Sequence, residues 1–237
     1  MPGSGNRRGC GMNRSLNIRA FRASVGGTAV MAGLLFVPAG TFDYWQAWLF
    51  MAVFVGSSAA VTVYLAMRDP MLLERRMRAG PTAEKEPKQK ILMLFAMMGF
   101  IALLVLPAID HRVGWSPVPS YVSLTADALI GLSFLLIFFV LKANTYGAST
   151  IQVAEGQQVI STGPYALVRH PMYAAAFPLL VGMPLALDSW WGLFVLIAFV
   201  PTLIGRLLDE ERFLREHLPG YTSYCKNVRY RLVPFVW

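Results

Sequence analysis

Two polar clusters in the C-terminal half contain the side chains best suited to do chemistry. The first surrounds Arg169, His170 and Pro171 and follows the turn-forming pair Gly163-Pro164. Because proline is favoured at the first position of a helix, Pro171 predicts a helix whose free N–H groups and positive dipole end lie beside Arg169 and His170. Such a helix end attracts an anion or a carboxylate. The competing interpretation is a plain membrane boundary, with Arg169 as its positive flank and His170 as an interfacial residue.

The second cluster, which contains Arg206, Asp209, Glu210 and Glu211, lies at the end of an apolar segment. Charged groups there are costly unless they are paired or line a polar cavity. Arg206 and Glu210 are four residues apart and share a helical face, whereas Glu211 points to a different one. A solvated helix end would look similar. We favour a mixed-charge pocket, because a helical hairpin between the clusters would return both glutamates to the level of His170.

The composition indicates that the rest of the chain is a membrane protein. Of the 237 residues, 56% are apolar and 14% are charged, whereas about 25% of the residues in an ordinary soluble domain are charged. We predict an all-α integral membrane protein, a bundle of about six transmembrane helices, or of five if one short segment does not fully span. The apolar segments that approach the ~20 residues needed to span are 25–42, 44–67, 91–109, 121–142, 172–187 and 190–208.

The distribution of basic residues predicts the orientation. With six crossings, all but one of the 21 lysines and arginines fall on one side of the membrane, and Arg112 is the exception. By the positive-inside rule that side is cytoplasmic, which places both termini and the 143–171 loop in the cytoplasm of a multi-pass cell-membrane protein. The net charge of +8 then reflects topology and contact with anionic membrane lipids. It requires no nucleic acid partner.

Three regions follow from this pattern: a basic cytoplasmic tail over 1–24, four spans over 25–142, and a core over 143–237 with a helical hairpin and a C-terminal cytoplasmic segment. The cysteines, Cys10 and Cys225, lie near opposite ends, and the three histidines are scattered. We therefore expect neither a disulfide framework nor a metal site.

Two connectors on the cytoplasmic side have distinct patterns. Residues 68–90 contain several prolines and charges, and 71–79 could form a short helix on the membrane surface. We favour a solvated charged loop that sets the topology. Residues 147–161 alternate polar and apolar side chains around Glu155-Gly156, which predicts a small β-hairpin over the cytoplasmic mouth, either a lid or a connector.

The order of motifs over roughly residues 145–237 resembles the isoprenylcysteine carboxyl methyltransferase and phospholipid methyltransferase group of integral membrane enzymes. The motifs that carry the resemblance are Gly163-Pro164-Tyr165, Arg169-His-Pro-x-Tyr173, Asp209-Glu-Glu-Arg212, Pro219-Gly-Tyr-x-x-Tyr224 and the segment from Val228 to Trp237. The first two spans resemble nothing beyond generic membrane helices.

The resemblance implies a methyltransferase that binds S-adenosyl-L-methionine in a cytoplasmic pocket without a Rossmann domain, and whose lipophilic acceptor arrives from the bilayer. The acceptor group stays open between a carboxylate, a thiol and an amine. Arg169 and Arg206 would orient an anionic acceptor, and Glu211 is the third catalytic candidate. The residues implied for the cofactor are Gly163, Pro164, Tyr165, His170, Tyr173 and Glu210, with Glu211 as an alternative to Glu210 for its amino or ribose groups.

Two other functions compete with methyl transfer. Membrane sterol reductases resemble this group in their C-terminal parts, including an Arg-His-Pro-like segment, but bind a nicotinamide cofactor and have more spans. A non-enzymatic transporter or scaffold would place polar residues at mid-bilayer, whereas the charged residues here stay near segment ends. We therefore favour the methyltransferase.

Overall fold

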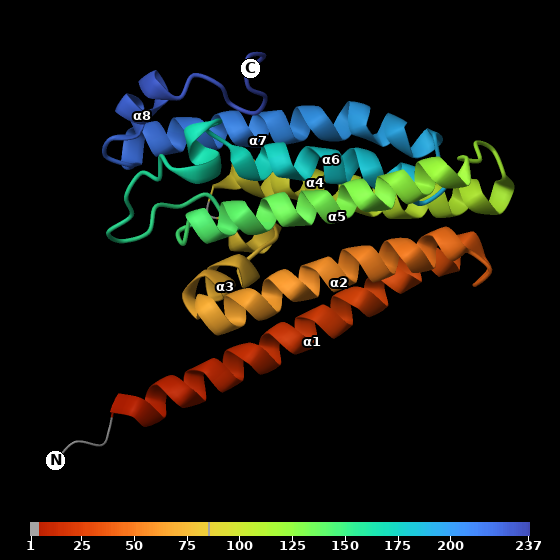
Figure 1. Cartoon of the computed structure of the whole chain (residues 1–237), viewed down its shortest axis with the longest axis horizontal. Coiled ribbons are helices and arrows are strands. Elements are labelled where there is room, and N and C mark those ends of the chain that lie inside the picture. The colour runs from red at the N-terminus through yellow and green to blue at the C-terminus, as the bar shows by residue number, and fades with distance from the viewer. Residues whose placement is uncertain (1–4, 85) are drawn as a thin grey trace.

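The structure, a computed structural model, describes residues 5–84 and 86–237 as a bundle of long helices lying side by side (Figure 1). These residues contain no strand. In chain order the elements are α1 (Gly5–Ala39), α2 (Trp45–Arg68), α3 (Pro70–Met77), η1 (Pro81–Ala83), α4 (Pro87–Val113), α5 (Ser120–Ala143), η2 (Gly163–Ala166), α6 (Pro171–Ala186), η3 (Trp191–Phe194), α7 (Val195–His217) and α8 (Tyr221–Asn227).

Five helices are long and apolar enough to cross a membrane, by length and composition. Helix α6 has 16 residues and extends about 24 Å, less than the about 30 Å of a hydrocarbon core. Five is therefore the number of helices long enough to span, and the shorter α6 also runs between the two ends of the bundle (Figure 1). The five long segments are Arg14–Ala39, Trp45–Arg68, Pro87–Val113, Ser120–Ala143 and Trp191–His217.

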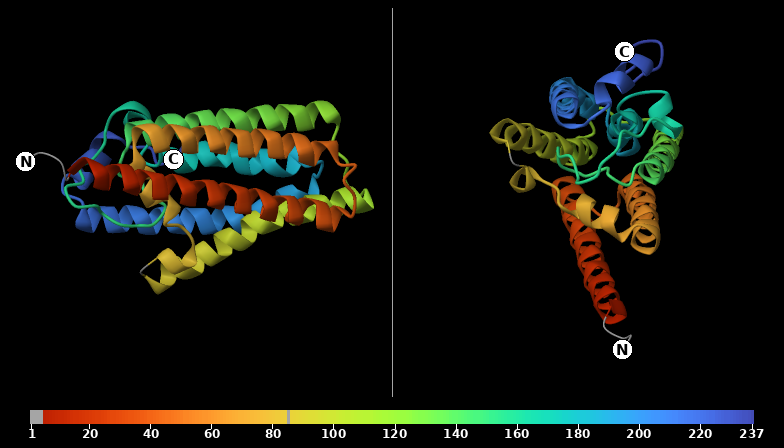
Figure 2. Two further views of the ribbon diagram at one scale, coloured as in Figure 1. Left: turned by 90° about the horizontal axis from the view of Figure 1, so that it is seen from below. Right: turned by 90° about the vertical axis from the view of Figure 1, so that its left-hand side faces the viewer.

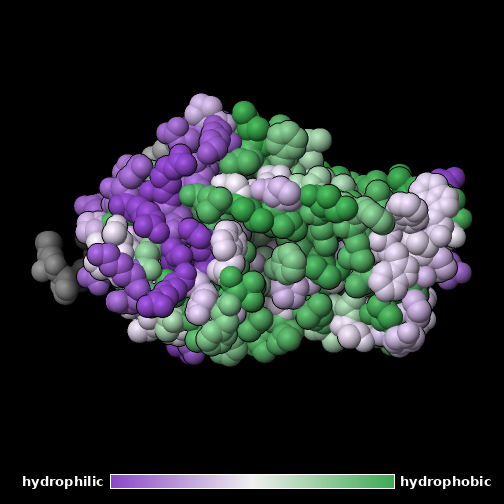
Figure 3. Space-filling view, turned by 90° about the horizontal axis from the view of Figure 1, so that it is seen from above, coloured by the Kyte–Doolittle hydropathy of each residue, from purple (hydrophilic) through white to green (hydrophobic). Residues whose placement is uncertain are grey.

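The surface separates a polar end from an apolar belt. Hydrophilic residues gather at the end that holds α3 and α8, and a broad apolar band follows them (Figures 1 and 3). Large apolar side chains are exposed on the outer faces of the long helices, including Val63, Phe95, Leu135 and Ile197. In water this exposure would be costly, so the belt identifies the protein as a multi-pass integral membrane protein.

Helix α6 lies inside the bundle, where it contacts α2, α4, α5 and α7. It packs most closely along α5, because a Cβ atom at Gly182 would lie 3.2 Å from the carbonyl oxygen of Ala126. Small residues allow such close approach between membrane helices. Helix α7 packs instead along α4, and α1 leans away from the others toward its N-terminal end (Figure 2). Helices α6 and α7 thus form the predicted hairpin but touch each other little.

The hairpin turn is fastened at the end of the bundle opposite the polar end. The carboxylate of Asp110 accepts hydrogen bonds from the backbone N–H and hydroxyl of Ser116 and from the hydroxyl of Ser189. The hydroxyl of Tyr44 donates to the carbonyl of Leu187 over 2.5 Å. These bonds fix where α6 ends and α7 begins, and so the register in which α7 returns toward the polar end.

Three sequence predictions about the polar end need correction or extension. The solvated loop favoured for 68–90 is wrong over 70–77, because α3 forms there and buries Leu72 and Leu73. The β-hairpin predicted over 147–161 is also wrong, because only its turn at Glu155-Gly156 exists and no ladder forms beside it. The expected tail is already helical from Gly5, and its first four residues lie outside the described part.

Candidate functional site

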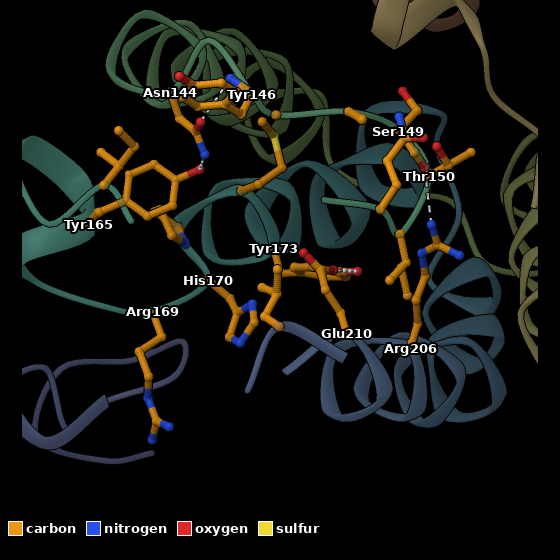
Figure 4. Close-up of a pocket in the computed structure, with 18 of the residues that line it drawn as sticks. Asn144, Tyr146, Ser149, Thr150, Tyr165, Arg169, His170, Tyr173, Arg206 and Glu210 are labelled. Atoms are coloured by element: carbon orange, nitrogen blue, oxygen red, sulfur yellow. Dashed lines mark hydrogen bonds between the residues drawn. The ribbon is translucent and has the colours of Figure 1, made fainter. Parts of the chain in front are cut away.

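A cavity of about 400 Å³ opens among the helices at the polar end (Figure 4). Its roof is the connector between α5 and η2, which contributes Asn144, Tyr146 and most of residues 147–160. Its walls and floor come from α3, α4, α6, α7 and α8. Helices α6 and α7 make few contacts with each other, and the cavity occupies the space between them.

The floor of the cavity is apolar. It is lined by Met93 and Ala96 of α4, Leu180 of α6, and Phe199 and Leu203 of α7. Of these helices, α4 and α7 also contribute outer faces to the apolar belt. The cavity therefore joins a polar chamber under the connector to an apolar chamber inside the bundle.

The segment before α6 is held by the C-terminal residues of the chain. The backbone N–H groups of Arg169 and His170 donate to the carbonyls of Tyr230 and Arg231, both over 2.9 Å. The hydroxyl of Tyr224 donates to the carbonyl of Tyr165 over 2.7 Å. The C-terminal residues thus position the first polar cluster, a role that the sequence analysis did not predict.

The three successive acids of α7 point in three directions, as the about 100° turn per residue of an α-helix requires. Asp209 accepts a hydrogen bond from Lys88 over 2.6 Å. Glu210 lines the cavity and accepts from the hydroxyl of Tyr173 over 2.8 Å. Glu211 turns away from the cavity. The two polar clusters meet, as the hairpin predicted, through Tyr173 and Glu210.

The buried carboxylate of Glu211 lies at the centre of a cluster of three arginines. Its carboxylate is 2.6 Å from Arg169, 2.6 Å from Arg215 and 2.8 Å from Arg231, and its side chain is 4% exposed. The Nε2 atom of His170 lies 3.6 Å from the same carboxylate, beyond hydrogen-bonding distance. This arrangement joins α7, the segment before α6 and the C-terminal residues.

The guanidinium of Arg206 also bonds neighbouring protein groups. Its guanidinium lies 2.6 Å from the carboxylate of Glu84 and donates to Gln89 over 3.2 Å and to the carbonyl of Ser149 over 3.0 Å. Its predicted partner on the same helical face, Glu210, forms no ion pair with it. Arg206 therefore ties the connector above the cavity to α4 and α7.

The hydroxyl groups around the cavity are neutral hydrogen-bonding groups. Burial raises the pKa of Tyr165, whose hydroxyl accepts a hydrogen bond from the side chain of Asn144 over 3.0 Å. Burial likewise raises the pKa of Tyr224. Neither phenol supplies an anion at physiological pH.

Six of the nine predicted site residues line the cavity, and three do not. Gly163 and Pro164 lie in η2 behind Tyr165, and Gly163 has φ +59°, a backbone conformation that favours glycine. Glu211 is the third. The residues that line the cavity are Tyr165, Arg169, His170, Tyr173, Arg206 and Glu210.

Several residues around the cavity were not predicted. Glu84 and Gln89 belong to the connector taken for a solvated loop, and Asn144 follows directly after a span. The cavity-lining Arg76 was counted only as a topology signal. The signal available was the mixed polarity of 68–90, which also fits a loop in water, so the sequence alone did not single these residues out.

Comparison with known proteins supports the resemblance. The family model described as "Phospholipid methyltransferase" matches residues 122–219, from α5 to the end of α7. A stretch of 94 residues, 38% of this chain, is 32% identical to the mouse Delta(14)-sterol reductase TM7SF2, and it spans 22% of that protein's length. The region 122–219, which contains the two polar clusters that meet at the cavity, is therefore similar to the phospholipid methyltransferase family.

Proposed function

We propose that this protein is an integral membrane methyltransferase that uses S-adenosyl-L-methionine to methylate a lipophilic acceptor drawn from the bilayer. The observation that carries the proposal is the single cavity that joins a charged chamber under the connector to an apolar chamber among α4, α6 and α7. A polar cofactor fits the first chamber and the lipophilic part of an acceptor fits the second. The polar end of the bundle would face the cytoplasm.

The residues present fit this cofactor. His170 lines the cavity, is 4% exposed, and has an Nε2 atom with no hydrogen-bond partner among the described residues. This nitrogen faces Glu211, which lies outside the cavity, so the fit to a polar ligand rests on Tyr173 and the carboxylate of Glu210, which line the cavity. His170, Tyr173, Glu210 and the backbone near Tyr165 would hold the cofactor, whose sulfonium supplies an already activated methyl group.

The protein then has to align the acceptor and exclude water. Arg169 and Arg206 are already bonded to Glu211 and Glu84, respectively. We therefore assign Arg169, Arg206 and Glu211 as positioning residues that hold the walls of the cavity rather than as groups that touch the reacting atoms. A carboxylate or thiolate acceptor needs no general base, whereas an amine acceptor loses a proton after transfer.

Calorimetric titration of the detergent-purified protein with S-adenosylhomocysteine tests the proposal. We expect saturable binding by the wild type and an affinity lowered about 10- to 100-fold in His170→Ala and Glu210→Ala, since each loses a hydrogen bond or a charge at the ligand. Glu216→Ala, an exposed change on the same helix as Glu210, serves as the matched control. Wild-type affinity in both site variants, or no binding by the wild type, would refute the proposal.

The second candidate is a nicotinamide-dependent reductase, which the 32% identity to the mouse sterol reductase favours. A dinucleotide brings a pyrophosphate with two negative charges, whereas two of the three arginines that line the cavity, Arg169 and Arg206, are already paired with carboxylates. Titration with a reduced nicotinamide nucleotide in parallel decides between the two. Saturable binding of the nucleotide alone would replace the methyltransferase by the reductase.

A further inference from the structure

The charges that line the cavity do not cancel one another in pairs. Arg169 and Arg206 each form an ion pair with an acid, Glu211 and Glu84, that does not line the cavity. The remaining lining charges are Arg76 and Glu210. Within residues 14–84 and 86–237, whose side chains are described, neither of them forms an ion pair. The cavity thus presents one free cation and one free anion.

Arg76 is placed for a ligand rather than for solvent. It belongs to α3, and its backbone carbonyl accepts a hydrogen bond from Ser149 of the cavity roof over 2.9 Å. Its guanidinium, which carries five donors, makes one long bond of 3.4 Å to the carbonyl of Gly147. Burial lowers the pKa of Arg76, the direction expected for a cation that is removed from water without a counterion.

The free anion, the free cation and Tyr165 line the same cavity. Burial is the main cause that raises the pKa of Tyr165, and the charge of Glu210 raises it further while the charge of Arg76 lowers it. Both charges therefore act at the Tyr165 hydroxyl. Figure 4 shows this side chain and Glu210 from opposite walls of the same cavity. A ligand that passes Tyr165 can meet both charges.

An amino-acid end, with a carboxylate and an ammonium on one carbon, matches such a pair of charges. We propose that Arg76 binds the carboxylate of the amino-acid end of S-adenosyl-L-methionine, while Glu210 faces its ammonium. This inference rests on the proposed function and adds a cofactor-binding residue from outside the matched region 122–219. Guanidinium and carboxylate form strong, often bidentate hydrogen bonds.

The test combines a change in the protein with a matched change in the ligand. The ligands are S-adenosylhomocysteine and its decarboxylated analogue, S-adenosyl-3-thiopropylamine, titrated against the wild type and Arg76→Gln. We expect Arg76→Gln to lower the affinity for S-adenosylhomocysteine about 10- to 100-fold and to leave the affinity for the analogue unchanged. Arg78→Gln removes the same charge just after the end of the same helix, at a side chain that is 72% exposed, and should change neither affinity.

The outcomes separate the two proposals. If the wild type binds neither ligand, the proposed function fails and the inference falls with it. If the wild type binds both ligands equally, or if Arg76→Gln weakens both by the same factor, the carboxylate does not contact Arg76 and only the inference is overturned. The wild-type comparison needs no variant to fold, and Arg76→Lys, which keeps the charge, should retain part of the preference for S-adenosylhomocysteine.

Discussion

Replacing Glu211 by glutamine separates a structural role for this carboxylate from a chemical one. Glutamine keeps the size of the side chain and removes its charge. Arg169, whose side chain is 7% exposed, would lose the carboxylate 2.6 Å away. Arg215 and Arg231 also bind Glu211, but their side chains are 41% and 29% exposed and can turn toward water. The loss therefore falls mainly on Arg169.

The expected cost follows from leaving one buried charge unpaired, which amounts to about 3–5 kcal/mol. For a chain of this size each kcal/mol shifts the melting temperature by roughly 2–4 °C. We expect Glu211→Gln to lower the apparent Tm in detergent by about 6–20 °C. The wild type and the variants are heated at the same scan rate, because unfolding of membrane proteins is often irreversible and the apparent Tm then depends on that rate. Binding of S-adenosylhomocysteine should weaken as well, since Glu211 fixes the segment of His170.

Glu216→Gln is the matched control, because it makes the same chemical change at an exposed position of the same helix. It should shift stability by no more than about 0.5 kcal/mol. If Glu211→Gln and Glu216→Gln have the same Tm, the bonds between Glu211 and the three arginines do not stabilise the site. If it melts like the wild type but loses turnover, Glu211 contacts the substrate or the cofactor, as the family resemblance implied.

Two further changes test the walls of the cavity. Gly99→Ala would place a Cβ atom 2.5 Å from the ring of Phe199, so we expect the protein to lose about 1–3 kcal/mol of stability in thermal unfolding. The double variant Gly99→Ala/Phe199→Leu should recover part of that stability. Equal melting temperatures for the single and double variants would contradict the prediction. In Arg206→Lys the lysine cannot form all three hydrogen bonds of the guanidinium, so a protease should cut the connector over 144–162 faster than in the wild type. In Arg212→Lys, a change at an exposed position of the same helix, the connector should be cut at the wild-type rate. Equal rates for both lysine variants would show that Arg206 does not fasten the roof.

The parts of the structure that the sequence predicts well depend on local or regular patterns. Apolar segment length gives α2, α4 and α5 to within a few residues of their observed bounds. The contact between Tyr173 and Glu210 follows from two antiparallel helices joined by a short turn, since that connection brings residues 37 apart to one level. The predicted separation of the segments 172–187 and 190–208 is confirmed, because α6 ends at Ala186 and α7 begins at Val195.

The parts that it misses depend on partners far away in the chain. Arg206 and Glu84 are 122 residues apart, and the charge pattern of 68–90 does not reveal whether a side chain meets water or a partner. The predicted β-hairpin fails for a related reason. The side chain of Gln157 bonds the backbone N–H of Ala154, and that of Glu84 bonds the backbone N–H of Ile151 over 3.4 Å, so these groups are not free to form a ladder.

The cavity combines walls of different origin along the chain. The residues proposed to hold the cofactor, Tyr165, His170, Tyr173 and Glu210, all lie inside the region that matches the phospholipid methyltransferase family. The α4 wall of the apolar chamber, and Arg76 above it, lie outside that region. A change at Met93 or Ala96 of α4 would alter the wall of the apolar chamber, while the bonds of Lys88 and Gln89 to Asp209 keep α4 attached to α7. We therefore propose that the matched region carries out methyl transfer and that α4 influences which acceptor fits.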